Sequence, residues 1–372
     1  MVRVAIIDDE INLRYLAHPE RVIKKMSVLH QPPRAAEKCT HSTVCAMIWE
    51  KCGSNYEIIG IQAMADRRKS ASIHSLAEAL NLCHHLSIDM VCMSIGSSIL
   101  SDFPKLDGIL SRLYNTGIIM VAALSNSGHI TLPASDPRVV GVQCDWQRFM
   151  EPGQISWESA HPLGIQLTAS CAYDGLPVPF YGPSNSYAVP VAGAKIAKLL
   201  NAGVKSFPEL LSHLKKESCR KAESSLFSLR REEILWISQN FQRQLPWVLI
   251  IREDETLDEK IISQMHDGFG YEVVGIRDHA SRDIRLFGIK DLSMPLEASV
   301  FYLEKHVKSD LICFFSHSEK EASLLRADAV GWIQKNFIKL QGEGQKKRIF
   351  PLITEPTEKV FCRELVQLLT ED

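Results

Sequence analysis

The stretch VAIIDDEIN (residues 4–12) decides the fold of this chain, because an apolar run passes directly into an acidic pair. Such a run is typical of a parallel strand that is buried on both faces. Asp8 follows it at once and would project from the carboxyl end of the strand, where open α/β sheets place their functional side chains. The stretch therefore predicts a parallel sheet with a carboxylate at its working edge.

Similar runs recur through the first 200 or so residues and alternate with helical segments. Residues 75–86 and 104–115 carry apolar side chains at helical spacing, and Pro104 stands near the first turn of the second segment. This alternation predicts an α/β fold, with a parallel sheet that has helices on both faces. The strands that we expect besides residues 2–7 are 58–63, 88–95, 118–124 and 138–143.

Three further motifs bring other reactive side chains to the ends of these elements. His41 opens a helical stretch, CTHSTVCAMI (39–48), and Ser186 begins the helix expected over 186–200, in PSNSYAVPVAGA (183–194). Asn126 comes just after an apolar strand, in VAALSNSG (121–128). Hydrolysis of an amide needs a nucleophile, a base to take its proton and a group that holds the base in one tautomer. Asp8, His41 and Ser186 supply these three groups.

In this order of acid, base and nucleophile, the motifs resemble the subtilisin-like serine protease family over about residues 1–204. HSTVCAMI resembles the family's H-G-T-x-V-A-G, and SNSYAVP resembles G-T-S-M-A-x-P. The resemblance implies a subtilisin-like sheet with Asp8, His41 and Ser186 as the catalytic triad. It implies Asn126 as the side-chain donor of the oxyanion hole.

The stretch MSIGSS (93–98) resembles the family's S-L-G-G segment, along which an extended substrate pairs as an added strand. The resemblance implies that Ser94, Ile95 and Gly96 bind the substrate. Gly96 would let a peptide approach closely, since it has no Cβ.

Several of these positions have rivals or simpler interpretations. Asp9 competes with Asp8 as the acid, and Ser184 competes with Ser186 as the nucleophile. The family positions, directly after the strand and four residues before Pro190, favour Asp8 and Ser186. Ser184 and the residue after it replace the family's Gly-Thr. Each residue also has a structural reading, as a turn Asp, a helix-capping Ser or a turn Asn.

The rest of the chain carries no catalytic motif that we recognise. Residues 206–244 are rich in charge and predict a helical connector after a peptidase domain over 1–205. A smaller α/β domain is expected over 245–372, and we predict that it recognises the substrate. Its expected strands include WVLIIR (247–252), YEVVGIR (271–277), DLICFF (310–315) and RIFPLI (348–353).

Composition excludes several classes of partner and cofactor. The 42 Lys and Arg residues nearly cancel the 44 Asp and Glu residues, which argues against nucleic acid and acidic membranes as partners. No apolar run is long enough to span a bilayer. We expect neither a cofactor nor a structural metal, because no acidic loop has calcium-binding spacing and the cysteines lack zinc spacing.

The ten cysteines are scattered without a CxxC pair, which predicts free thiols in a reducing cytosol. The N-terminus shows no secretory signal and leaves no room for a propeptide before Asp8, so the expected location is cytoplasmic.

The sequence thus predicts a cytosolic serine endopeptidase that cleaves a dedicated peptide or protein. One setting is the removal of a leader from a ribosomally made, modified peptide. The alternative is a catalytically silent, subtilisin-like binding protein, which the altered residues around Ser186 and Asn126 suggest. The sequence does not indicate an oligomeric state.

Overall fold

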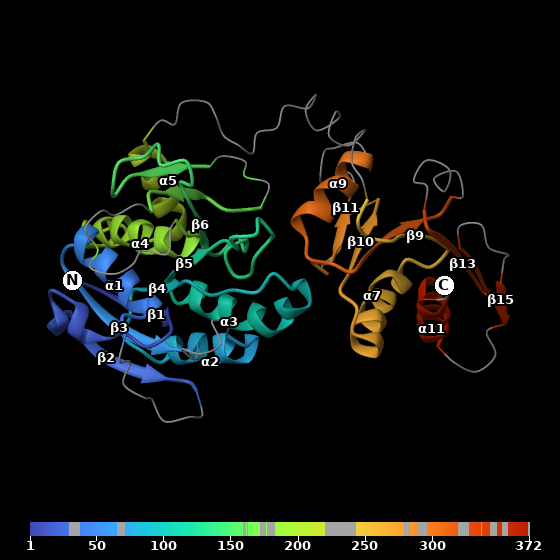
Figure 1. Cartoon of the computed structure of the whole chain (residues 1–372), viewed down its shortest axis with the longest axis horizontal. Helices are drawn as coiled ribbons and strands as arrows, with labels where there is room; N and C mark the ends of the chain where they lie inside the picture. Colours follow the sequence, from blue (N-terminus) through green and yellow to red (C-terminus); the bar gives the residue numbers. More distant parts are fainter. Residues whose placement is uncertain are drawn as a thin grey trace. The chain divides into compact units, whose positions relative to one another are not determined.

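A computed structural model describes most of the chain, which forms two compact units: residues 1–98 with 102–228, and residues 99–101 with 229–372 (Figure 1). The boundaries expected at 205 and 245 stay predictions, and part of the expected connector, residues 220–242, lies outside the described residues. The described residues are 1–29, 38–64, 71–158, 161, 163–171, 176, 183–219, 243–278, 281, 283–288, 296–318, 327–335, 337–342, 348–351 and 356–370.

The first unit is built on an eight-stranded sheet in the order β2-β3-β1-β4-β5-β6-β8-β7. All neighbouring strands pair in parallel except β7 and β8, which are antiparallel. The bounds are β1 Val2–Asp8, β2 Val22–Ser27, β3 Tyr56–Gln62, β4 Met90–Met93, β5 Ile119–Ala123, β6 Val140–Cys144, β7 Ile155–Trp157 and β8 Leu167–Ala169. The strands predicted from the apolar runs are therefore confirmed as β1, β3, β4, β5 and β6, and the α/β fold class is confirmed with them.

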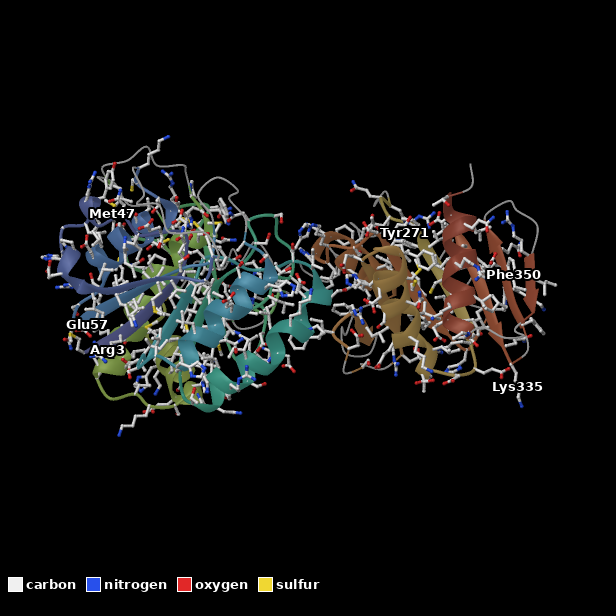
Figure 2. All side chains as sticks on the ribbon, turned by 90° about the horizontal axis from the view of Figure 1, so that it is seen from below. Arg3, Met47, Glu57, Tyr271, Lys335 and Phe350 are labelled. Carbon is white, nitrogen blue, oxygen red and sulfur yellow. A yellow bond between two sulfur atoms is a disulfide. The ribbon has the colours of Figure 1, made fainter. Side chains whose placement is uncertain are left out.

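The register of the sheet is fixed mainly by its buried side chains. Arg3 of β1 lies opposite Glu57 of β3, and their side chains form an ion pair with Nε and Oε2 2.7 Å apart (Figure 2). This pair is solvent-exposed, and exposed pairs contribute little to stability. A slip by one residue would instead move Val4 and Ile6 to the opposite face of the sheet, which the packing does not allow.

Helices cover both faces of the sheet, as the alternating pattern predicts (Figure 1). Val4 and Ile6 belong to the core that α1, α4 and α5 complete on one face, and α2 and α3 pack together on the other. The α-helices are α1 His41–Cys52, α2 Ile73–His84, α3 Phe103–Asn115, α4 Asn185–Asn201 and α5 Phe207–Glu217. Short 3-10 helices span Leu13–Tyr15, Pro19–Arg21 and Leu100–Asp102.

Helices α1 and α4 approach each other closely at Gly193. A Cβ at this position would overlap the indole ring of Trp49 on α1 and would lie 2.9 Å from Sγ of Cys92 on β4. Trp49 is fully buried, so its ring has no free space into which to move. Glycine is therefore required here for packing, since its backbone conformation is an ordinary helical one.

The expectation that all cysteines are free is wrong for two of them. Cys144 and Cys171 form a disulfide with a Cα–Cα distance of 5.7 Å, and the other eight cysteines are not disulfide-bonded. The two residues are 27 positions apart in the sequence, but parallel pairing of β6 with β8 sets Cys144 opposite Ala169, two residues before Cys171. Because this contact arises from strand pairing, the spacing of the cysteines did not reveal it. The expected cytoplasmic location stays a prediction.

The second unit has a seven-stranded sheet in the order β11-β10-β12-β9-β13-β14-β15. The first five of these strands run parallel to one another. The strand β14 pairs antiparallel with β13 on one side and with β15 on the other. Helices α7 and α11 pack on one core of this unit. The bounds are β9 Trp247–Arg252, α7 Thr256–Phe269, β10 Val273–Arg277, β11 Leu286–Gly288, α9 Leu296–His306, β12 Leu311–Ser316, β13 Ala329–Gln334, β14 Phe337–Gly342, β15 Arg348–Pro351 and α11 Thr357–Thr370.

The smaller α/β fold expected for residues 245–372 is present, although its β11, β13 and β14 were not predicted. The expected strand over 348–353 continues beyond the described residues after Pro351. In both units, no helix among the described residues is long and apolar enough to cross a membrane.

Replacing Gly193 by alanine tests the contact between α1 and α4. We expect Gly193→Ala to lower the free energy of unfolding by about 1–3 kcal/mol, because the added methyl group overpacks the core. Gly108→Ala is the matched control: Gly108 is an exposed glycine inside α3, and the only atom near an added Cβ is the flexible end of Arg112, 3.7 Å away. The control should raise stability by about 0.5–1 kcal/mol. Urea denaturation followed by circular dichroism measures both, and equal effects would contradict the proposed packing.

Counting thiols tests the disulfide. In denaturant without reductant, we expect iodoacetamide to alkylate eight cysteines, because Cys144 and Cys171 are joined, and to alkylate all ten after reduction. Mass spectrometry of the intact protein gives both counts. Ten alkylated thiols before reduction would show that the two cysteines are free.

Candidate active site

The predicted site residues meet at one edge of the first sheet because the chain reaches this edge at the end of every parallel strand. Asp8 is the last residue of β1, Ser94 comes directly after β4, and Asn126 comes three residues after the end of β5. These strands are neighbours in the sheet. A helix that connects parallel strands runs back across the sheet, so α1 and α4 begin at the same edge and bring His41 and Ser186 to it.

Asp8 and His41 form a direct pair. Nδ1 of His41 lies 2.7 Å from Oδ2 of Asp8, and the carboxylate of Asp8 is fully buried while the imidazole is 29% exposed. A buried carboxylate at Nδ1 holds the ring in the tautomer whose Nε2 can accept a proton. Of the two acidic residues that the sequence offered, Asp8 is the one that bonds to the imidazole.

Asp9 has a different position and holds the beginning of α1. Its Oδ2 accepts the backbone N–H of His41 at 3.1 Å, and its Oδ1 accepts the N–H of Ser42 at 2.8 Å. Thr40, the N-cap of the helix, accepts the N–H of Thr43 at 3.2 Å. The first three amides of α1 are therefore satisfied by side chains, and a negative charge at the positive end of the helix dipole is favourable.

The charges of this cluster shift two pKa values. Burial would lower the pKa of His41, but the charge of Asp8, its hydrogen bond to the ring and the charge of Asp9 raise this pKa from 6.5 to about 9. Burial, followed by the charge of Asp8, raises the pKa of Asp9 from 3.8 to about 6. At neutral pH the imidazole of His41 is therefore protonated, and the carboxyl group of Asp9 is mostly ionised.

Ser186 is the second residue of α4, whose N-cap is Ser184. Among the described residues, the hydroxyl of Ser186 donates to the backbone oxygen of Ser94 at 3.4 Å rather than to His41. Catalytic hydrogen bonds are often loose in unliganded enzymes and tighten when substrate binds.

Two other contacts place Ser186 beside the Asp8–His41 pair. The ring of Tyr187, the next residue, stacks on the imidazole of His41 with centroids 5.2 Å apart and an interplanar angle of 30°. Sγ of Cys45 lies 3.9 Å from the backbone oxygen of Ser186, and it lies within 4.8 Å of ligand atoms of both Asp8 and His41. The structure therefore brings the three members of the predicted triad into one cluster.

Asn126 reaches the beginning of α4 with both ends of its side-chain amide. Its Oδ1 accepts the backbone N–H of Asn185 at 3.0 Å, and its Nδ2 donates to Oγ of Ser184 at 3.4 Å. The N–H of Ser186 also donates to Oγ of Ser184, at 3.3 Å. The two donors that the resemblance assigns to an oxyanion hole, Nδ2 of Asn126 and the N–H of Ser186, thus converge on one point.

Residues 94–96 follow β4 at the mouth of this site. Ser94 and Ile95 are partly buried and Gly96 is exposed. The next residue, Ser97, forms an antiparallel bridge with Leu132, with both N–O distances 2.7 Å. A Cβ on Gly96 would lie 2.6 Å from the backbone oxygen of Leu132. The close contact with Leu132 within this chain therefore already requires glycine at this position. Substrate pairing along residues 94–96 stays a prediction.

Asn185 and Asp9 hold the site in place, and the sequence did not assign either of them this role. Asn185 is buried, accepts the N–H of Cys144 at 2.8 Å, and donates to the oxygens of Leu124 and Ser125 at 3.0 and 3.1 Å. It therefore ties the first turn of α4 to the ends of β5 and β6. An Asn at the family's Thr position was the only available signal, and its long-range partners cannot be seen in a sequence.

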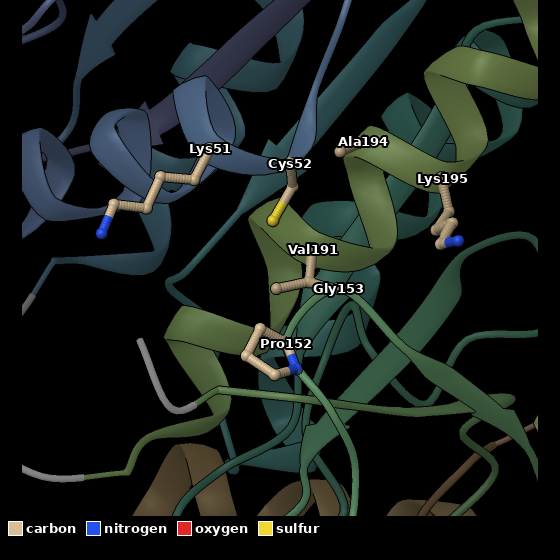
Figure 3. A pocket seen from close by; sticks show the side chains of 7 residues that line it. All are labelled: Lys51, Cys52, Pro152, Gly153, Val191, Ala194 and Lys195. Carbon is tan, nitrogen blue, oxygen red and sulfur yellow. The ribbon is translucent and has the colours of Figure 1, made fainter. Parts of the chain in front are cut away.

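A separate hollow of about 520 Å³ lies between α1, α4 and the turn at Pro152 and Gly153 (Figure 3). Lys51 and Lys195 lie on either side of it, and Cys52, Val191 and Ala194 complete its lining (Figure 3). None of the predicted site residues contributes to it.

Comparisons with known proteins give matches only among solved structures, since no family model and no curated protein matches the chain. The chain is similar to a lanthipeptide protease, with 14% identity and a TM-score of 0.47 over 58% of this chain and 79% of that one. It is similar to the prenylagaramide maturation protease PagA, with 17% identity and a TM-score of 0.43 over 59% of this chain and 88% of that one.

A cold adapted subtilisin-like serine proteinase is also similar, with 16% identity and a TM-score of 0.47 over 60% of this chain and 84% of the other.

The pKa of His41 predicts the pH dependence of the site. Only a neutral imidazole can take the proton of Ser186, so the rate of reaction with a fluorophosphonate should rise between pH 7 and about pH 9. Below about pH 6, protonation of Asp9 removes one of the charges that raise the pKa of His41, so the rate should fall less steeply with pH there. Labelling rates measured from pH 5 to pH 10 give the profile, with Ser186→Ala as the blank. A rate that is already constant above pH 7 would contradict the assigned charges around His41.

Proposed function

We propose that this protein is a serine endopeptidase in which Asp8, His41 and Ser186 form the catalytic triad. The observation that carries the proposal is the 2.7 Å contact between the buried carboxylate of Asp8 and Nδ1 of His41, next to a serine in the first turn of α4. If Asp8 and Ser186 only capped a turn and a helix, their side chains would not need to lie close to the imidazole of His41. The beginning of a helix also favours the negative charge that develops during attack by the serine.

The geometry supports an ordinary acyl-transfer sequence. Oγ of Ser186 attacks the carbonyl carbon of the scissile peptide bond while Nε2 of His41 takes the hydroxyl proton, and Asp8 stabilises the imidazolium that forms. Nδ2 of Asn126 and the N–H of Ser186 donate to the oxyanion. His41 then gives its proton to the leaving amine, and a water molecule hydrolyses the acyl-enzyme by the same route.

The setting that we propose is cytosolic cleavage of a dedicated substrate, for example removal of a leader from a ribosomally made, modified peptide. This part rests on the sequence resemblance alone. We propose further that residues 245–372 recognise the substrate, because they form an α/β sheet of their own and contain no catalytic motif.

One specific observation favours the alternative, a silent binding protein. The hydroxyl of Ser186 is bonded to Ser94, and Oγ of Ser184 lies where the two expected oxyanion donors converge. A protein of this kind would keep the fold and the Asp8–His41 pair but would not react with an activated phosphonate. Reaction with such a probe therefore separates the two functions.

Labelling with a fluorophosphonate tests the nucleophile. We expect wild-type protein to be labelled at Ser186, and we expect Ser186→Ala to abolish labelling because this substitution removes the proposed nucleophile. Ser184→Ala is the matched control and should retain labelling. In-gel fluorescence and peptide mapping by mass spectrometry identify the modified residue. Labelling that survives Ser186→Ala but not Ser184→Ala would assign the nucleophile to Ser184, and no labelling in any variant would favour the binding protein.

A further inference from the structure

The side chain of Ser184 occupies the position expected for the oxyanion. Its Oγ accepts two hydrogen bonds, from Nδ2 of Asn126 at 3.4 Å and from the N–H of Ser186 at 3.3 Å. Among the described residues it has no hydrogen-bond acceptor of its own. An oxygen that accepts from both donors and donates to neither has the hydrogen-bonding pattern of the oxyanion.

The sequence explains why this chain differs from the motif that it resembles. The motif has glycine two residues before the nucleophile, and glycine has no side chain with which to cap the helix. In this chain Ser184 is the N-cap of α4, with extended backbone angles of φ −153° and ψ 143°, and its hydroxyl accepts the N–H of the second residue of the helix. This second residue is Ser186, so the capping bond uses the amide that the reaction needs.

We propose that Ser184 gates the oxyanion hole: its hydroxyl fills the hole in the free enzyme, and the carbonyl oxygen of the substrate must displace it before Ser186 can be acylated. This inference rests on the proposed function. Rotation of the Ser184 side chain about one bond frees both donors without movement of the helix. Asn126 keeps its orientation during this rotation, because its Oδ1 remains bonded to the N–H of Asn185 at 3.0 Å.

The gate gives the enzyme a restraint that acts before chemistry. A substrate must use part of its binding energy to break the two bonds to Ser184, so a ligand with few contacts elsewhere would react slowly. The two bonds are long, and the net value of a hydrogen bond in water is small, so displacement should slow acylation by about 3- to 10-fold. Ser184 therefore restrains acylation by every substrate, while discrimination between substrates is left to residues that contact their side chains.

The test is the substitution Ser184→Gly in the full-length protein, which removes the hydroxyl and restores the residue of the motif. We expect the second-order rate constant for labelling by a fluorophosphonate to rise about 3- to 10-fold. The inhibition constant of phenylboronic acid should fall by a similar factor, because its tetrahedral adduct places a negatively charged oxygen at the same point. Glycine is an acceptable N-cap that costs only a few tenths of a kcal/mol, so the fold should be retained.

Two further variants make the test specific. Ser206→Gly removes the capping serine of α5, which bonds to the N–H of Glu209 and touches none of the site residues, and it should leave both constants unchanged. In an Asn126→Ala background, the gain from Ser184→Gly should be smaller, because one of the two donors that hold the gate is absent. If Ser184→Gly does not fold, Ser184→Ala removes the same hydroxyl and should show the same gain.

The outcomes separate this inference from the proposed function. An unchanged or lower rate in Ser184→Gly, with wild-type protein labelled at Ser186, would overturn the gate; a rate that falls tenfold would instead make Ser184 a third donor to the oxyanion. If neither wild-type protein nor Ser184→Gly is labelled, the proposed function fails and the gate fails with it. Labelling of Ser184→Gly but not of wild-type protein would support both.

Discussion

Two adjacent buried carboxylates join the end of β1 to the beginning of α1, and the candidate site depends on this junction. Asp8 binds the imidazole of His41, while Asp9 binds the backbone amides of His41 and Ser42. One carboxylate thus orients the ring and the other fixes the backbone that carries it. Two negative charges so close together repel, and the positive end of the helix and the protonated imidazole offset only part of the repulsion, since the pKa of Asp9 stays raised.

The beginning of α4 is held by amides instead of charges. Asn185 bonds to the backbone at the ends of β5 and β6, and Asn126 bonds to the backbone of Asn185. In the proposed reaction an anion develops at this position, and neutral partners suit it because a resident carboxylate would oppose the anion. The two helices therefore begin at the same edge of the sheet in different electrostatic surroundings, α1 beside two acidic side chains and α4 beside neutral amides.

The sequence predicted those features that depend on local composition and missed those that depend on distant contacts. Buried strands and the beginnings of helices have strong local signals, so the five parallel strands and the positions of Asp8, His41 and Ser186 could be predicted. The strand β14, Phe337–Gly342, alternates buried and partly exposed residues and had a period-two signal that was overlooked. The disulfide of Cys144 and the bonds of Asn185 join segments that only the folded sheet brings together.

The contact of Gly193 with Trp49 has a consequence for how the site can respond to a ligand. It locks α4 against α1. Position 186 lies seven steps along the helix from position 193, a distance of about 10 Å, so any sliding of α4 would also move the site. Because the interlocked surfaces resist sliding, changes at the site are left to torsions of single side chains, which are completed in picoseconds to nanoseconds. The helices and the sheet are thus rigid, and only a few side chains at the site rotate. Binding of a ligand therefore needs no slow rearrangement of the helices or the sheet.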